Sequence, residues 1–94
     1  MVIHITKNVI SAADLLLDKE KQAFQSCHDP VSLALNIQTD FHGWFTNGER
    51  AILIYNESMS FDLPDNIKKF LKNWELRNKV SPTSFDIPDY VKSI

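Results

Sequence analysis

The chain has 94 residues, a net charge of −2 at pH 7, 44% hydrophobic residues and 23% charged residues. This length suits one domain whose single core needs no metal or disulfide to fold. No apolar run approaches the roughly 18 residues that a membrane-spanning helix requires. The N-terminus carries neither a positively charged segment nor a small-residue cleavage site, so we expect a cytoplasmic location. The single cysteine, Cys27, excludes an internal disulfide and argues against redox chemistry.

Two elements are predicted before residue 29. Residues 2–6 are rich in β-branched side chains, which predicts a short strand. Ser11 and Asp14 have the spacing of a helix N-cap and an acidic first turn, so we expect a helix from Ala12 to Ser26. Its apolar stripe has helical period and comprises Ala13, Leu16, Leu17, Ala23, Phe24 and Cys27.

Asp29-Pro30 should end this first helix, because the residue before a proline is pushed out of the α region. The stretch that follows alternates between two sets of side chains with a period of two. This alternation predicts a strand over residues 31–39 with one core face and one polar face. The core face comprises Val31, Leu33, Leu35, Ile37 and Thr39.

The strongest local signal is Asn47-Gly48, which stands between two runs of aromatic and β-branched residues. Such a pair predicts a β-hairpin with a type I′ turn, whose two central residues both need positive φ. The arms of the hairpin would be residues 41–45 and 51–55. We expect this hairpin to form the middle of a sheet.

Both faces of the predicted hairpin are apolar, so the pattern leaves their orientation open. If helices cover the face of Phe41 and Phe45, Trp44 is exposed, and Ile52 or Ile54 is exposed with it. In the opposite arrangement Trp44 belongs to the core. The two arrangements fit the sequence about equally well.

A second helix is predicted to open at residues 63–66, where a proline and an acidic residue fit the first turn. Four large apolar residues then follow at the i, i+3, i+4 and i+7 spacing of an amphipathic helix. They are Ile67, Phe70, Leu71 and Trp74. A basic row on the opposite side of this predicted helix, residues 66–80, comprises Lys68, Lys69, Lys72 and Lys79, with Leu76 among them.

Taken together, these elements predict a small single-domain α+β sandwich. Two helices would pack on a three- to four-stranded, mostly antiparallel sheet, in the order β-α-β-β-β-α. Residues 1–80 would form the domain. Residues 81–94 would form an extended tail that packs on the domain or trails from it, tied down by Phe85, Ile87 and Tyr90.

Motifs for catalysis and metal binding are weak. The three histidines lack the spacing of a metal site on a helix. Carboxylates are close in sequence at Asp62 with Asp65 and at Asp86 with Asp89, but beside prolines such aspartates favour local hydrogen bonds in caps and turns. Two glycines cannot build a phosphate-binding loop. We therefore expect a protein that is not an enzyme and that holds neither a cofactor nor a metal.

By exclusion, we expect a protein-binding inhibitor or regulator that occludes a partner protein. Immunity proteins, antitoxins and phage-encoded factors against host or defence enzymes are of this kind. Residues 1–65 carry nine acidic residues against four basic ones, which suits a basic, nucleic-acid-handling target. A homodimer could use the same surface. The residues expected to contact the partner are His42, Trp44, Arg50, Ile52 and Ile54.

The alternative hypothesis is a nucleic-acid-binding module, because residues 66–80 carry five basic residues against one acidic residue. Its contacts would come from Lys68, Lys69, Lys72, Leu76 and Lys79. The acidic balance of the whole chain favours a protein partner over nucleic acid. No membrane contact is expected.

Overall fold

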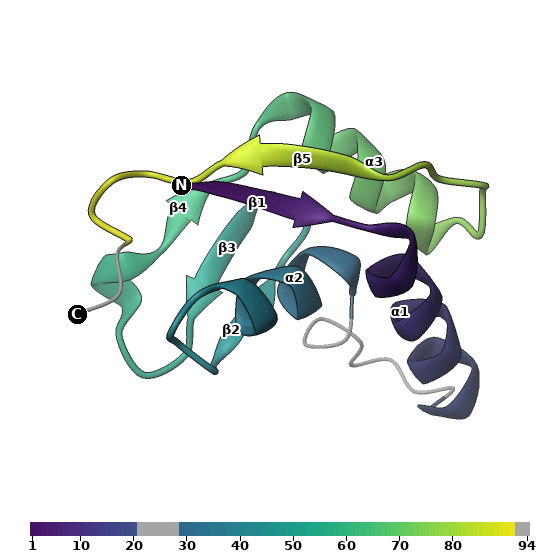
Figure 1. Ribbon diagram of the computed structural model, residues 1–94, viewed down its shortest axis with the longest axis horizontal. Coiled ribbons are helices and arrows are strands. Elements are labelled where there is room, and N and C mark those ends of the chain that lie inside the picture. The colour runs from purple at the N-terminus through teal and green to yellow at the C-terminus, as the bar shows by residue number, and fades with distance from the viewer. Residues whose placement is uncertain (21–28, 92–94) are drawn as a thin grey trace.

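The computed structural model describes residues 1–20 and 29–91, which form a small α+β domain (Figure 1). The predicted fold class is confirmed, although the described strands form two antiparallel sheets rather than one. The elements are β1 (Val2–Ile5), α1 (Lys7–Glu20), α2 (Pro30–Gln38), β2 (Trp44–Thr46), β3 (Arg50–Leu53), the 3₁₀ helix η1 (Glu57–Met59), β4 (Phe61–Asp62), α3 (Asp65–Glu75) and β5 (Thr83–Asp86).

The two sheets join segments from different parts of the chain. β1 pairs with β5, with Val2 opposite Asp86 and Ile5 opposite Thr83, whereas β2, β3 and β4 form the second sheet in that order. The segment expected to be an extended tail therefore supplies a strand. Phe85 in β5 is buried, as is Ile87 just after it.

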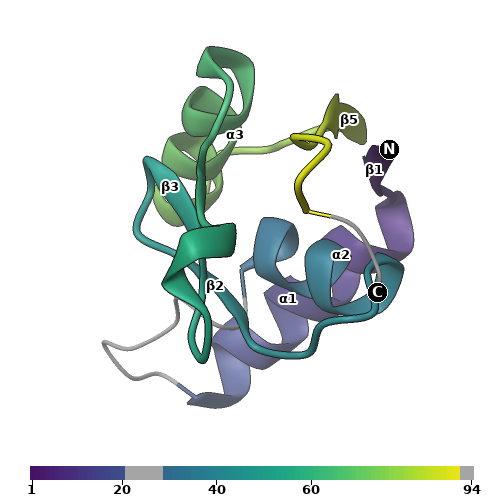
Figure 2. The same ribbon diagram turned by 90° about the vertical axis from the view of Figure 1, so that its left-hand side faces the viewer.

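Helix α2 lies between the two sheets and contacts both β1 and β2 (Figure 2). The hydrophobic core fills the space between the sheets and the helices. Its fully buried large side chains are Ile3, Ile5, Val31, Leu35, Trp44, Leu53, Ile67, Leu71 and Val91.

Helix α1 begins five residues earlier than predicted. The hydroxyl of Thr6 accepts a hydrogen bond from the Val9 amide at 3.2 Å, so Thr6 caps the helix in place of Ser11. Ala13 is buried, as the predicted stripe required. Leu16 is half-buried. The remaining members of that stripe fall on side chains that the structure does not describe, namely Leu17, Ala23, Phe24 and Cys27.

The predicted strand over residues 31–39 is wrong, because this segment is helix α2. The Asp29 carboxylate accepts a hydrogen bond from the Ser32 amide at 2.8 Å, and Pro30 occupies the first turn, so Asp29-Pro30 starts a helix. Val31, Ala34 and Leu35 are buried at helical spacing. The N-cap at Asp29 therefore favours a helix in this segment, although its side chains alternate with a period of two.

The predicted hairpin is present as β2 and β3, but it does not form the middle of a sheet, because β2 is an edge strand. Its turn also differs from the expected one. Asn47 donates its backbone N–H to the Arg50 carbonyl at 3.2 Å, which makes Gly48 and Glu49 the central residues. Gly48 has a φ of +89°, whereas Asn47 does not have a positive φ. The Asn47 side chain instead accepts backbone N–H groups of Glu49 and Arg50. The type I′ prediction is therefore wrong.

Helix α3 confirms the amphipathic prediction, since all four apolar residues of the predicted face are buried: Ile67, Phe70, Leu71 and Trp74. The helix ends at Glu75, earlier than expected. Arg77 takes a left-handed φ of 64°, and the Asn78 amide donates to the Asn73 carbonyl at 2.9 Å, which is a Schellman-type end. Lys79 therefore lies beyond the helix, and the basic row predicted over residues 66–80 is broken.

Candidate functional site

The inner face of the three-stranded sheet belongs to the core. Trp44 is only 1% exposed, and its indole N–H donates to the Thr39 hydroxyl at 3.0 Å. The ring of Phe61 meets Trp44 edge to face, with centroids 5.6 Å apart. Ala51 and Leu53 are also fully buried on this side. Of the two arrangements that the sequence allowed, the one with Trp44 in the core is correct.

The outer face carries a second set of apolar side chains. Phe45 stands opposite Ile52 in the ladder between β2 and β3, and the Ile54 amide donates to the Gly43 carbonyl at 2.9 Å. Ile54 is 66% exposed, whereas Phe45 and Ile52 are half-buried. Ile52 and Ile54 therefore share a face with Phe45, and not with Trp44 as expected.

Gly43 lets two side chains lie close to the backbone at the end of this face. A Cβ at position 43 would lie 2.9 Å from Cε1 of Tyr55 and 3.0 Å from Cγ2 of Ile54. The ring centroid of Phe41 lies 6.5 Å from that of Tyr55, which is 63% exposed. The face thus continues past the strand ends to the exposed Tyr55 and to the half-buried Phe41, which also packs against the core. We call the following residues the outer patch: Phe41, Phe45, Ile52, Ile54 and Tyr55.

A small polar pocket adjoins the outer patch at Ile52. It has a volume of about 250 Å³ and is lined by Arg50, Ile52, Glu57 and Ser60. Arg50 is bound to Asp62 at 3.0 Å between Nη1 and Oδ1. Within the described part of the chain, the Ser60 hydroxyl has no hydrogen-bond partner and Glu57 has no ion-pair partner. The Ser60 hydroxyl is buried, so the exposed Glu57 carboxylate is the acceptor that this pocket offers to a donor from outside.

The segment that carries the outer patch is acidic. Residues 40–65 contain five acidic side chains and one basic side chain, Arg50, if His42 is neutral. All five acidic residues are exposed: Asp40, Glu49, Glu57, Asp62 and Asp65. The outer patch is thus an apolar surface in an acidic part of the molecule.

The structure brings together three of the five residues predicted to contact a partner. Arg50, Ile52 and Ile54 lie on the outer face, and His42 is exposed next to this face in the chain, but Trp44 is not available at the surface. The residues predicted to contact a partner did not include Phe41, Phe45 or Tyr55, although the sequence carries a signal for Tyr55. The signal was Gly43, whose missing side chain leaves room for the tyrosine ring.

The residues predicted to bind nucleic acid do not form one continuous row. Lys69 and Lys72 are exposed on α3, whereas Lys68 is half-buried and lies 4.0 Å from the Asp65 carboxylate. Leu76 is exposed at the helix end. Lys79 lies in the loop after α3, beside a different pocket.

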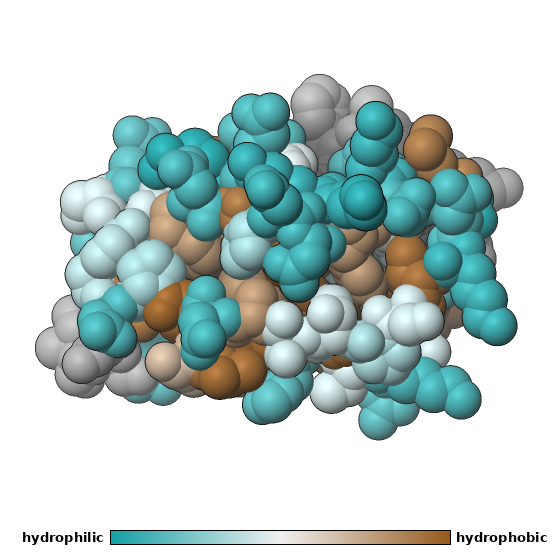
Figure 3. Space-filling model, turned by 90° about the horizontal axis from the view of Figure 1, so that it is seen from above, coloured by the Kyte–Doolittle hydropathy of each residue, from teal (hydrophilic) through white to brown (hydrophobic). Residues whose placement is uncertain are grey.

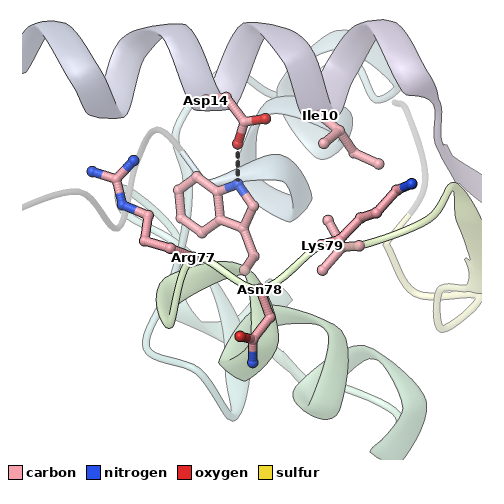
Figure 4. Close-up of a pocket in the computed structure, with 7 residues that line it drawn as sticks. Ile10, Asp14, Arg77, Asn78 and Lys79 are labelled. Atoms are coloured by element: carbon pink, nitrogen blue, oxygen red, sulfur yellow. Dashed lines mark hydrogen bonds between the residues drawn. The ribbon is translucent and has the colours of Figure 1, made fainter.

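That second pocket lies between α1 and the end of α3 and has a volume of about 400 Å³. Figure 4 shows Asp14 of α1 facing the indole of Trp74, with Arg77 and Lys79 extending to opposite sides. Asp14 Oδ1 accepts the indole N–H at 2.8 Å. Ile10, Asn78 and Val80 complete the lining. The hydrogen bond joins α1 to α3, so we interpret this contact as structural.

A buried polar cluster connects α2 to the inner face of the sheet. Asp29 is 3% exposed, and its Oδ2 accepts the hydroxyls of Ser32 and Thr46, each at 2.8 Å. Burial raises the pKa of Asp29 to about 6, although the hydrogen bonds from Ser32 and Thr46 act in the opposite direction. The hydrogen bond from Thr46 holds the start of α2 against β2, and the two from Ser32 cap the helix.

Within residues 1–20 and 29–91, no three His, Cys, Asp or Glu side chains are arranged to hold a metal ion. In the same ranges no helix is both long enough and apolar enough to cross a membrane. Comparisons with protein-family models, curated proteins and solved structures give no match. The candidate function therefore depends on the geometry alone.

Proposed function

We propose that this protein is a non-enzymatic regulator that binds a partner protein through the outer patch and occludes it. One observation carries the proposal: the outer face of the sheet exposes large apolar side chains, above all Ile54 and Tyr55, that the fold itself does not bury. An antiparallel sheet with one face in water usually carries polar residues on that face. Exposed apolar patches of this kind are typical of interaction surfaces.

The partner that fits this surface has an apolar contact area bordered by basic groups. The net charge of residues 40–65 is −4, from five acidic residues against one basic residue, and it would steer a basic surface toward the patch. Because Asp62 already pairs with Arg50, Glu57 is the carboxylate left at the pocket beside Ile52. A lysine or arginine of the partner would enter there.

Basic surfaces of this type occur on enzymes that handle nucleic acids, because such enzymes must bind phosphates. An acidic protein that covers this surface competes with the nucleic acid. We therefore propose that the protein is an inhibitor of the immunity, antitoxin or phage anti-host class. It would act by covering a surface of its target rather than by modifying it.

The test uses the full chain as bait for binding proteins, in three versions. The wild type is compared with Ile54→Lys, which places a cation in the outer patch, and with Leu15→Lys, which places the same group at an exposed leucine of α1. A specific partner binds the wild type and Leu15→Lys but not Ile54→Lys. The wild type should then inhibit the activity of that partner, and Ile54→Lys should not.

The proposal fails if every protein captured by the wild type is captured equally by Ile54→Lys. It also fails if the captured partner keeps its full activity when it is saturated with the wild type. Glu57→Lys gives a second readout, because it opposes a basic partner without changing the apolar patch. The affinity of Glu57→Lys for the partner should fall below that of the wild type, and the difference should be largest at low salt, where charges are least screened.

A second candidate function, nucleic-acid binding, is favoured by the charge of residues 66–80, which carry five basic residues and one acidic residue. Lys69 and Lys72 project from α3 into solvent. If this function holds, Lys69→Gln with Lys72→Gln lowers the affinity for single- and double-stranded probes and reduces the salt dependence of binding. If binding is equal in the wild type and the double variant, this candidate is excluded.

A further inference from the structure

Among the described residues, two of the four sheet edges are each covered at one residue by an amide side chain of α2. The Gln38 side chain accepts the His4 amide at 2.8 Å and donates to the His4 carbonyl at 2.7 Å. The Asn36 side chain makes the same pair of contacts with the backbone of Trp44. It accepts the Trp44 N–H at 2.9 Å and donates to the Trp44 carbonyl at 3.2 Å. At His4 and at Trp44 the amide takes the place that a neighbouring strand would have, so at these residues it competes with the pairing of β1 or β2 with another chain.

The third edge, that of β4, is short. The strand has two residues, Phe61 and Asp62, and Pro64 follows closely after it. The carbonyl of Ser60, just before β4, accepts the Tyr90 hydroxyl at 2.8 Å. Very short edge strands offer little to a second chain.

The fourth edge, that of β5, is open. The Ile87 amide donates to the Met1 carbonyl, so in the antiparallel register Phe85 and Thr83 also face β1. Ser84 and Asp86 then direct their N–H and C=O groups away from β1. Both residues are exposed, and no hydrogen bond from the described residues reaches these outward groups.

This open edge faces a broad side of the molecule. In Figure 1, β1 lies below β5, so the free edge of β5 points toward the top of the view. Figure 3 looks onto that side, where hydrophobic residues show between hydrophilic ones.

We propose that β5 pairs with β5 of a second copy of this chain, giving one continuous antiparallel sheet in the order β1-β5-β5-β1. The two-fold axis would pass between the two Phe85 residues. Ser84 of each copy would then stand opposite Asp86 of the other, and every outward N–H and C=O of these two residues would find a partner. The Ser84 hydroxyl would also lie beside the Asp86 carboxylate of the other copy.

The sequence around β5 selects this register over its neighbours. Moving the axis to Ser84 would bring Pro82, which has no N–H, opposite Asp86 of the other copy. Moving the axis to Asp86 would place two aspartates directly opposite each other and would bring Pro88 into the ladder. Pro82, Pro88 and Asp86 thus disfavour the two neighbouring registers, and the register with the two-fold axis at Phe85 remains.

The first test measures the molar mass in solution by light scattering, from about 10 µM to about 1 mM chain. The molar mass of the wild type should rise with concentration, from the monomer mass of 10.8 kDa toward twice that value. Ser84→Pro removes an outward N–H without touching the pairing with β1, and should raise the dimer Kd by about tenfold or more. Ser84→Ala keeps the N–H and should behave almost as the wild type.

The second test examines the register through charge. Ser84→Asp places two carboxylates opposite each other in each half of the interface and should weaken the dimer. Adding Asp86→Lys to the same chain should restore it, because the new carboxylate at position 84 would then face the new ammonium group at position 86 of the other copy. Hydrogen exchange of the Ser84 and Asp86 amides in the wild type should be slow in the dimer and fast in the monomer.

A wild type that stays monomeric throughout this concentration range would overturn the proposal. So would a dimer that Ser84→Pro and Ser84→Asp leave unchanged, since it must use another surface. Because β5 is outside the three-stranded sheet, this inference stands or falls separately from the function proposed for the outer patch.

Discussion

The two faces of the three-stranded sheet are both apolar, yet only one of them serves the fold. The inner face holds Trp44 and Leu53 at no more than 1% exposure, whereas the outer face leaves Ile54 at 66%. The inner face is also fastened by hydrogen bonds to Thr39 and Asp29. The difference teaches that apolar character alone does not mark a core. What marks it here is the set of polar contacts that hold neighbouring elements against one face.

The largest effect should come from truncating the inner face. Trp44→Ala removes a fully buried indole and its hydrogen bond to Thr39, so we expect the free energy of unfolding to fall by about 3–5 kcal/mol. Ile54→Ala on the outer face should cost about 0.5 kcal/mol or less. Urea unfolding of both variants measures the contrast. Similar losses in the two variants would mean that the faces are not distinguished as described.

The next effect depends on pH and concerns the attachment of α2 to the inner face. Because burial raises the pKa of Asp29 to about 6 from 3.8, the folded protein binds a proton more readily than the unfolded chain. The contribution of Asp29 to stability is therefore greatest below about pH 4 and is lost as the pH rises to about 6, a difference of roughly 3 kcal/mol.

Asp29→Asn isolates this contribution, because asparagine can keep the cap to Ser32 without titrating. Relative to this variant, the wild type should be more stable at pH 4 than at pH 7. Urea unfolding at both pH values gives the comparison. If the difference between wild type and variant is the same at pH 4 and pH 7, Asp29 does not titrate in this way.

A smaller effect should follow from opening the edge of β2. Asn36→Ala leaves the N–H and C=O of Trp44 without their side-chain partner, and we expect a loss of about 1–3 kcal/mol in the free energy of unfolding. The matched change, Gln38→Ala, should cost less because the Gln38 contacts with His4 are exposed. Thermal unfolding ranks the two variants. The reverse order would show that the β1 edge depends more on its amide.

The segments that were predicted correctly each have a sequence pattern that fits only one type of secondary structure. Helix α3 has four apolar residues at helical spacing, and no alternative period fits residues 67–74. The strand at residues 2–5 is short and β-branched. The hairpin was predicted from the turn, although the side-chain contacts of Asn47 moved its centre by one residue. In these segments local preference and tertiary packing agree.

The parts that could not be predicted have two patterns at once. Residues 31–39 alternate as a strand would, but Val31, Ala34 and Leu35 also lie on one side of a helix, and the cap at Asp29 decides between them. Likewise, both faces of the hairpin carry apolar side chains, so either face could be the buried one. Which one is buried depends on where α2 packs, through Asn36 against β2, and nothing in the hairpin itself specifies that contact.

The most direct test of the central claim combines two measurements on Ile54→Lys. The claim is that the face not needed for folding is the face that binds. We expect the free energy of unfolding of Ile54→Lys to stay within about 0.5 kcal/mol of the wild type, while its affinity for the partner captured by the wild type falls by about a hundredfold. Unchanged affinity, or a loss of affinity that merely follows a loss of stability, would contradict the claim.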